Sequence, residues 1–393
     1  MKEDLFIKHL AQTSPYPIGL EVDRAEGIYI YDKSGKAYMD MVSGIGVSNI
    51  GHGLKQVKEA LKKQIDKHLH VMVYGEFRQE AQEKFAALLS EVLPPELDTC
   101  YFVNSGTEAN EAALKLAKRI TGRSRLLAFI GSYHGSTHGS MSVSANESKK
   151  SAFRPLLPDV YFMRLNVFED LDLITKDVAA VILETVQGDA GVRSASADFM
   201  KALRQRCDET GALLILDEIQ CGMGRTGTLF AFEQVGIVPD ILTLGKALGG
   251  GLPIGAFISS RNNMEMLTQN PVLGHITTFG GHPLPCASGH AALKYMLHQN
   301  LMAEVESKGK LIEELLSSHP KVKEIRRRGL MFAIDLENAD VVQKVVYNCL
   351  ENGLITFWFL SCPHSFRLAP PLTISVEEIN KACMIILKEF DLL

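Results

Sequence analysis

The sequence predicts an α/β fold, with a large domain built on a mostly parallel sheet and a smaller α+β domain. In the middle third of the chain, short apolar runs alternate with segments of helical apolar spacing. That alternation is typical of a parallel sheet covered by helices on both faces. After about Pro285 the pattern becomes more helical. The length of 393 residues also exceeds what one hydrophobic core usually accommodates.

The composition is that of an ordinary globular protein. Hydrophobic residues make up 46% of the chain, charged residues 22%, and the net charge is −5. These values argue against nucleic-acid, membrane and disordered classes. The stretch from Met1 to Ser14 lacks a secretory apolar core, and no run approaches ~18 apolar residues. We therefore expect a cytoplasmic protein whose seven scattered cysteines are mostly buried, reduced thiols.

The first part of the chain predicts an N-terminal arm and two helices. Residues 27–40 carry alternating large apolar residues around a Lys-Ser-Gly turn, which indicates a hairpin. Apolar residues then recur at helical spacing over 54–70 and 79–92, and the second run stops at two prolines. We expect the arm to cover 1–53 and to pack with the smaller domain.

The central region, expected over 54–285, supplies the predicted sheet. Helices are predicted over 108–120 and 198–210, between several of the strands. The expected strands are 100–103, 126–130, 178–183, 213–216 and 241–244. The smaller domain is expected over 286–393, with strands near 328–335 and 366–368. Ligands in such folds bind beyond the carboxyl ends of the parallel strands.

A candidate phosphate site follows the first of these strands. Ser105 and Glu108 have the spacing of a capping box at the start of a helix. The plain interpretation is a well-capped helix that binds nothing. The functional one is that the backbone N–H groups of Gly106 and Thr107 bind a phosphate, helped by the helix dipole.

Two further polar residues stand just past predicted strands. Asp217 ends an apolar strand, where it either caps a turn or keeps a bound pyridine nitrogen protonated. With a cofactor bound there, Gln220 would be a candidate donor to a ring oxygen. Lys246 follows the next strand among glycines and apolar residues. Exposure on a loop is the ordinary state of a lysine. Burial would instead lower its pKa towards the neutral amine that attacks carbonyl groups.

Taken in order, these motifs resemble those of the class III pyridoxal-phosphate-dependent aminotransferases, the group of acetylornithine, ornithine and 4-aminobutyrate aminotransferases. The resemblance implies an aspartate-aminotransferase-like fold (fold type I) and a role in amino-acid metabolism such as arginine biosynthesis. It covers nearly the whole chain and rests on these segments: Gly27–Asp32, Gly51–His52, Ser105–Ala109, Tyr133–Gly135, Leu216–Gln220, Gly224–Gly227, Thr243–Gly251, Thr278–Gly281 and Arg367–Pro370.

The resemblance also implies roles around pyridoxal 5′-phosphate. Lys246 would form the internal aldimine and shuttle a proton, and Asp217 would pair with the pyridinium nitrogen. Thr278 would reach the phosphate from a second subunit, which implies a homodimer with shared active sites. The remaining expected cofactor-binding residues are Ser105, Gly106, Thr107, Tyr133, His134, Glu184, Ile219 and Gln220. Among them, Tyr133 and Ile219 would cover the two ring faces.

For the substrates, the resemblance implies ping-pong transfer from an ω-amino compound to 2-oxoglutarate. Arg367 matches the family arginine that binds a carboxylate bidentately. Asp189 stands where many relatives have a glutamate that pairs with this arginine. Ser136 stands where acetylornithine and ornithine enzymes carry an arginine for the far carboxylate, and near the N-terminus only Ser14 or Tyr16 could align with the tyrosine of ornithine enzymes. An acetylornithine-like donor, ornithine and 4-aminobutyrate all stay open, as does a substrate with a neutral far end.

Two other site classes compete with this interpretation. Residues 222–227 match G-x-G-x-x-G, which would suggest an NAD(P)-dependent oxidoreductase. That fingerprint requires a helix opening at the glycines and an acidic residue ~20 positions later, neither of which is expected here. His134 and His138 have the spacing of a helical metal site, yet they lie among glycines and serines where no helix is expected. We therefore predict no metal site.

Overall fold

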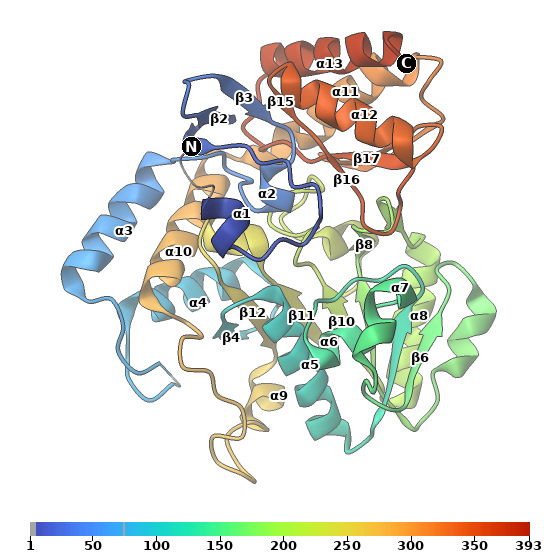
Figure 1. Cartoon of the computed structure of the whole chain (residues 1–393). Coiled ribbons are helices and arrows are strands. Elements are labelled where there is room, and N and C mark those ends of the chain that lie inside the picture. The colour runs from blue at the N-terminus through green and yellow to red at the C-terminus, as the bar shows by residue number, and fades with distance from the viewer. Residues whose placement is uncertain (1–4, 74) are drawn as a thin grey trace.

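A computed structural model of the chain describes residues 5–73 and 75–393. A central sheet lies between layers of helices, and the C-terminal part of the chain forms a second body of helices and strands above it, beside the N-terminal strands (Figure 1). Within the described residues, no helix is both long and apolar enough to cross a membrane.

The central sheet has seven strands. All run in the same direction except β12, which is antiparallel to its neighbours β11 and β4. In spatial order the strands are β4 (Thr99–Val103), β12 (Gly255–Ser259), β11 (Ile241–Leu244), β10 (Leu213–Asp217), β7 (Val178–Glu184), β5 (Arg125–Phe129) and β6 (Val160–Met163). This confirms the predicted mostly parallel sheet. The carboxyl ends of β4, β5, β7, β10 and β11 meet at one edge of the sheet.

Alternate strand residues face opposite layers, as a pleated strand requires. Ile182 and Ile215 belong to the core under α5 (Gly106–Thr121), whose buried side is rich in alanine. Leu183 and Leu216 point to the other face and join the core that contains α8 (Ala197–Thr210). Helix α4 (Glu80–Val92) packs against β4, and α10 (Pro283–His298) packs against both α4 and α3 (Lys55–Lys67). The short helices of this part are α6 (His138–Ser142), α7 (Glu147–Lys150) and α9 (Arg261–Glu265).

Two smaller sheets connect the ends of the chain. One contains β1 (Val22–Glu26), β2 (Tyr29–Asp32), β3 (Ala37–Asp40) and β15 (Leu354–Ile355). The other contains β13 (Glu324–Arg328), β14 (Met331–Asp335), β17 (Ser365–Leu368) and β16 (Phe357–Trp358). Because β15 pairs in parallel with β3, the N-terminal arm and the C-terminal part share a sheet. The expected boundaries at residues 53 and 285 stay predictions.

Helices and short turns complete the described chain. The C-terminal helices are α11 (Val305–Ser317), α12 (Ala339–Glu351) and α13 (Val376–Asp391), and the N-terminal ones are α1 (Leu5–His9) and α2 (Ser43–Gly46). The 3-10 turns are η1 (Ser151–Phe153), η2 (Phe168–Leu173), η3 (Ala231–Val235), η4 (Lys246–Gly249) and η5 (Leu301–Glu304), and a short ladder joins β8 (Val186–Gln187) to β9 (Arg193–Ser194).

Most predicted elements are confirmed, with four corrections. Strands β6 and β12 were not predicted; they are short runs of four and five residues. The strand expected near 328–335 is a hairpin of β13 and β14 that turns at Gly329, whose φ is +54°. A helix not expected after His134 does form as α6, and it begins at His138.

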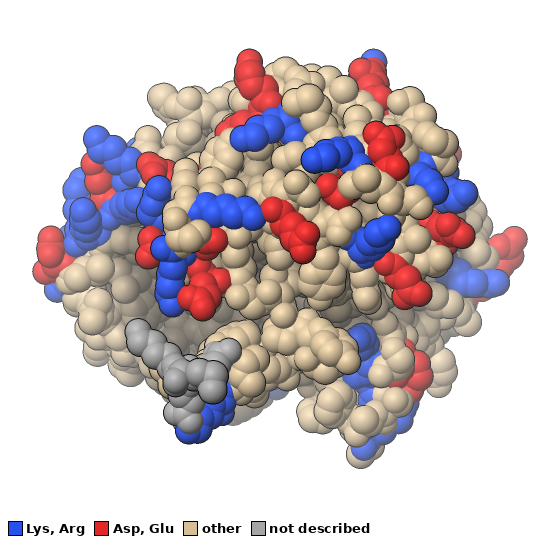
Figure 2. Space-filling view, turned by 45° about the horizontal axis from the view of Figure 1, so that its top comes forward, with Lys and Arg blue, Asp and Glu red and all other residues tan. Residues whose placement is uncertain are grey.

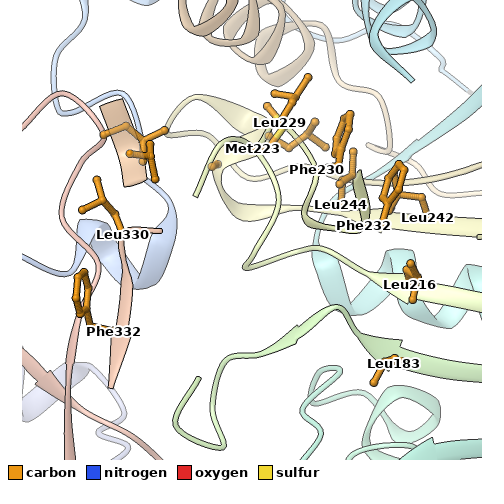
Figure 3. Close-up of a cluster of buried hydrophobic side chains, with 14 of the residues drawn as sticks. Leu183, Leu216, Met223, Leu229, Phe230, Phe232, Leu242, Leu244, Leu330 and Phe332 are labelled. Atoms are coloured by element: carbon orange, nitrogen blue, oxygen red, sulfur yellow. The ribbon is translucent and has the colours of Figure 1, made fainter. Parts of the chain in front are cut away.

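One hydrophobic cluster joins the central sheet to the C-terminal part. It contains Leu216 and Leu244 at the strand ends, and Leu330 and Phe332 at β14, all fully buried. Figure 3 shows this continuity, with Met223 and Leu229 lying between Leu330 and Leu244. The two bodies therefore share one core where the cavity described below opens.

Arg225 crosses the same junction and is only 1% exposed. Its guanidinium donates to the carbonyl oxygens of Leu330 (3.1 Å) and Pro370 (2.5 Å), and also to the side-chain oxygen of Asn49. Three segments far apart in the sequence are thus bonded to one side chain.

Surface charges of both signs are interspersed on the face shown in Figure 2. Glu80, for example, lies between Lys67 and Lys84, and these exposed pairs lower the pKa of its carboxyl to about 2. Such solvent-exposed pairs contribute little to stability, whereas buried polar groups that lose a partner cost more.

We predict that Arg225→Met destabilises the fold by about 3 kcal/mol, because it leaves three buried oxygens without their donor. The midpoint of urea unfolding measures this loss. Arg261→Met, at an exposed arginine that begins α9, is the matched control and is expected to change stability by about 0.5 kcal/mol at most. Equal midpoints for the two variants would contradict the prediction.

We also predict that stability falls as the pH rises from 4.5 to about 7. Glu218 is buried and accepts the backbone N–H groups of Ala231 and Phe232, and its burial raises its pKa from 4.5 to about 7. The folded state therefore holds a proton that the unfolded state has released, and this stabilisation is lost across that interval. Glu218→Gln should flatten the slope of unfolding free energy against pH. An unchanged slope would refute the assignment.

Candidate active site

A cavity of about 420 Å³ opens at the carboxyl ends of the central strands. This size lies within the usual range for a small-molecule site. It brings together twelve of the residues predicted from the sequence: Gly106, Thr107, Tyr133, His134, Ser136, Glu184, Asp189, Asp217, Ile219, Gln220, Lys246 and Arg367. Ser105 and Thr278 do not line it. Ser105 caps α5 just behind the wall, and Thr278 lies exposed elsewhere on the chain.

Asp217, the last residue of β10, is held by a buried hydrogen-bond network. Its Oδ2 atom accepts the side-chain amide of Asn110 (2.8 Å) and lies 2.7 Å from Nδ1 of His134. Its Oδ1 atom accepts the backbone N–H of Ile219 (3.0 Å). Thr243 in turn donates to the oxygen of Asn110 (2.8 Å). Asp217 therefore caps the next turn and also lines the cavity, so its role as a cap does not compete with a role towards a ligand.

Lys246 begins the 3-10 turn η4 directly after β11. Its φ is +46°, a conformation that non-glycine residues adopt mainly where the surrounding structure enforces it, often at functional sites. Desolvation lowers the pKa of its ammonium group, while Asp217 and Glu184 oppose that shift. The side chain is thus poised closer to the neutral amine than a surface lysine would be.

The N-terminus of α5 lines one part of the cavity through Gly106 and Thr107. The first N–H groups of a helix have no partner within the helix, and Gly106 and Thr107 occupy those positions here. Gly135 has a φ of +132°, and a side chain there would collide with the Thr107 hydroxyl. The predicted capping box is only half formed. Ser105 accepts the Glu108 N–H (3.3 Å), but the Glu108 carboxylate turns back to Asn104 instead of Ser105.

Glu184 fixes the loop that carries Tyr133. Its carboxylate accepts the backbone N–H groups of Tyr133 (2.8 Å) and Gly188 (2.9 Å). Burial raises the pKa of Glu184 to about 7, with His134 opposing the shift and Asp217 adding to it. The Tyr133 hydroxyl lies 3.1 Å from the Ser136 hydroxyl at the cavity edge.

Arg367 is buried on β17 and faces Asp189 at 3.7 Å. The Asp189 carboxylate also accepts the backbone N–H of Leu360 (3.0 Å) and the hydroxyl of Ser361 (2.7 Å). Burial lowers the pKa of Arg367 to about 10. Although an aspartate is shorter than a glutamate, Asp189 forms an ion pair with Arg367, without a hydrogen bond between them. The same carboxylate holds residues 360–361 in place.

Sequence reasoning missed two sets of site residues. Asn110 was hidden in the helical pattern of α5, although a polar residue between alanines of a buried face was a usable signal. Phe357, Trp358 and Leu360 also line the cavity. They belong to no motif, and their one signal was the Phe-Trp-Phe-Leu run that contains the single tryptophan of the chain.

The competing sites are not assembled. No helix opens at residues 222–227, which form turns around the buried Arg225, so a dinucleotide fingerprint is not supported. The ring of His134 is buried against Asp217, whereas His138 is exposed at the start of α6. Ser14 and Tyr16 are exposed and neither lines the cavity.

The residues of the cavity fit pyridoxal phosphate. A buried carboxylate on Asp217, a desolvated amine on Lys246 and a helix N-terminus are the groups that a pyridine nitrogen, a carbonyl and a phosphate require. Two buried nitrogens of the lining, Nε2 of His134 and Nε of Arg367, have no hydrogen-bond partner within the described chain. A bound polar ligand would account for such unpaired atoms.

Comparison with known proteins agrees with this geometry. The family model described as "Aminotransferase class-III" matches residues 11–390. Acetylornithine aminotransferase of Bacillus subtilis (strain 168) is 38% identical over 370 residues, covering 92% of this chain and 93% of the relative.

Two solved structures share the fold. A Bacillus anthracis aminotransferase superposes with a TM-score of 0.93 at 28% identity, covering 99% of this chain and 97% of its own. The ornithine aminotransferase of Toxoplasma gondii, described with partial occupancy of PLP at its active site, gives 0.91 at 28% identity, covering 98% and 92%. These likenesses confirm the expected aspartate-aminotransferase-like fold. The chain belongs to the class-III aminotransferases and is a pyridoxal-phosphate-dependent transaminase.

Proposed function

We propose that this transaminase moves an amino group from a primary ω-amino compound to a 2-oxo acid. The candidate donors are an acetylornithine-like compound, ornithine and 4-aminobutyrate, and the acceptor expected from the sequence is 2-oxoglutarate. The donor's amine carbon becomes an aldehyde, and the acceptor's ketone becomes an amine, so no external oxidant is needed. The observation that carries the proposal is Lys246 facing Asp217 in one cavity with Arg367.

When bound, pyridoxal phosphate supplies a carbonyl that takes up the amine and a ring that stabilises negative charge on the adjacent carbon. We assign its phosphate to the N-terminus of α5, its ring to the space between Tyr133 and Ile219, and its ring nitrogen to Asp217. The network of His134 and Asn110 around Asp217 supports that last assignment, because it keeps the carboxylate in place within a buried site.

The chain's own side chains would then divide the remaining work. The Nζ atom of Lys246 would remove a proton from the substrate carbon and return it, which a lowered pKa favours. Arg367 would bind the carboxylate beside the ketone of the acceptor through its planar fork. While a donor without that carboxylate is bound, Asp189 would balance the charge of the arginine, as its position 3.7 Å away supports.

We further propose a homodimer in which Thr278 serves the active site of the partner subunit. Support comes from an exposed apolar segment around it: Val272 is 72% exposed and Phe279 is 54% exposed. Such patches are uncommon on monomers. The seven cysteines, all unpaired, are in keeping with the proposed cytoplasmic location.

We predict that the cofactor-loaded enzyme is yellow and that borohydride bleaches it, leaving a stable adduct on Lys246 that mass spectrometry locates. Lys246→Ala should lower amino transfer by about a thousandfold or more, because it removes the proton carrier. Lys294→Ala, at an exposed lysine of α10, is the control and should retain colour and activity. A colourless protein, or an adduct on another residue, would count against the proposal.

The dimer is tested by sedimentation. We expect the wild-type protein to sediment as a dimer and Phe279→Asp to shift it towards the monomer, since the substitution places a charge in the apolar contact. Phe153→Asp makes the same change at a phenylalanine of similar exposure, 53%, and should leave the dimer intact. A monomeric wild-type protein at micromolar concentration would refute the shared site.

A further inference from the structure

A cluster of three side chains of the metal-ligating types lies outside the cavity, in the C-terminal part of the chain. It consists of Asp335, Cys362 and His364, whose carboxylate oxygen, thiol sulfur and imidazole nitrogen all lie within 4.8 Å of one another. Asp335 is 7% exposed and Cys362 is 3% exposed, whereas the side chain of His364 is 47% exposed. The cluster therefore has a buried base and one side open to solvent.

A tight turn presents two of these side chains. Residues 362–365 read Cys-Pro-His-Ser, and the backbone N–H of Ser365 donates to the carbonyl oxygen of Cys362 (3.1 Å). Proline favours the second position of such a turn. Ser365 then pairs with Asp335 in the antiparallel ladder of β17 and β14, and the Leu336 N–H donates to the carbonyl oxygen of His364 (2.9 Å). Backbone bonds therefore hold the turn against the end of β14.

The separations between the ligand atoms match a tetrahedral site. Nε2 of His364 lies 3.5 Å from Oδ2 of Asp335 and 3.6 Å from Sγ of Cys362. Ligand atoms at the usual zinc distances of about 2.0–2.3 Å stand about 3.3–3.8 Å apart around a tetrahedron. Little movement of the side chains therefore brings all three to one cation, and a fourth position faces the open side for water.

The charges around the cluster balance a divalent cation. Arg326 donates to both carboxylate oxygens of Asp335, at 2.6 Å each, and also pairs with Glu324. The guanidinium by itself would disfavour another cation. Asp335, Glu324 and a Cys362 thiolate together offset the guanidinium and a divalent cation in full. Because each carboxylate oxygen has two lone pairs, Asp335 can bind a cation and keep Arg326.

We propose that Asp335, Cys362 and His364 form a binding site for a zinc-type divalent cation. Oxygen, sulfur and nitrogen ligands of these types are the ones that zinc takes up in proteins. The thiol releases its proton to solvent when the cation binds, and no redox step is involved. The expectation of no metal site rested on His134 and His138, which take no part in this cluster.

The cluster adjoins the segment that reaches the candidate active site. Cys362 follows Ser361, whose hydroxyl donates to the carboxylate of Asp189 (2.7 Å), and the Leu360 N–H donates to the same carboxylate (3.0 Å). Asp189 in turn faces Arg367. A cation bound to Cys362 restricts residues 360–362 and, through them, the carboxylate that faces Arg367. The site therefore acts as a clamp on this segment.

Equilibrium dialysis of the cofactor-loaded enzyme against Zn²⁺, followed by metal analysis, tests the site. We expect one zinc per chain. His364→Gln should weaken binding by about tenfold or more, because loss of a ligand costs at least as much as loss of an outer-shell partner. His298→Gln, at an exposed histidine of α10, is the matched control and should bind as the wild type does. A wild-type protein that retains no zinc, or equal affinities of the two variants, would overturn the proposal.

Cobalt(II) reports on the ligands themselves, because tetrahedral Co²⁺ absorbs visible light much more strongly than octahedral Co²⁺. With one equivalent of Co²⁺, the wild-type enzyme should gain tetrahedral bands at longer wavelengths than the yellow cofactor absorbs. Cys362→Ser should remove these bands. Cys383→Ser, at a buried cysteine of α13, should keep them. Bands that persist unchanged in Cys362→Ser would rule out this thiol as a ligand.

Hydrogen exchange tests the clamp. Saturating Zn²⁺ should slow amide exchange about tenfold in a peptide that contains Leu360 and Ser361, since the cation stabilises the form that binds it. His364→Gln should show no such slowing at the same zinc concentration. Exchange in the wild type that is unaffected by bound zinc would overturn the clamp.

Discussion

The site depends on one buried carboxylate, that of Asp217. It is only 4% exposed, and Asn110, His134 and the backbone N–H of Ile219 hold it in place through hydrogen bonds. Each partner comes from a different element: a helix, a loop and the turn after the strand. Fixing this carboxylate therefore fixes the relative positions of α5, the Tyr133 loop and β10, which are the elements that outline the cavity.

The second half of the cavity is positioned from across the domain junction. Arg225 bonds to Asn49, Leu330 and Pro370, and one apolar cluster continues from β10 to β14. The strands that carry Phe357 and Arg367 belong to this C-terminal body. The residues proposed to hold the cofactor thus lie at the large sheet, whereas Arg367 and Phe357 reach the cavity from the smaller one.

The sequence predicted which residues of the proposed cofactor half meet in one cavity, because they follow strand ends, where parallel sheets usually present ligand groups. Asp217, Lys246 and Gly106 are each recognisable from a few neighbouring residues. The aromatic wall of the cavity was not predictable in this way. Phe357 and Trp358 look like any short apolar strand, and their meeting with Tyr133 depends on the packing of distant segments. Asn110 was missed because a polar residue in an amphipathic helix is expected to face solvent. In α5 Asn110 is instead buried together with the alanines of the helix.

The pairing of β3 with β15 bears on how the chain reaches this structure. Lys36 donates to the carbonyl oxygen of Glu351 (2.7 Å) across 315 residues, beside the ladder that joins Met39 to Leu354. Contacts of such long range are entropically costly to close and slow to form. During synthesis the N-terminal arm must wait for nearly the whole polypeptide before it finds its partner strand. The arm is thus among the first segments made and among the last to settle.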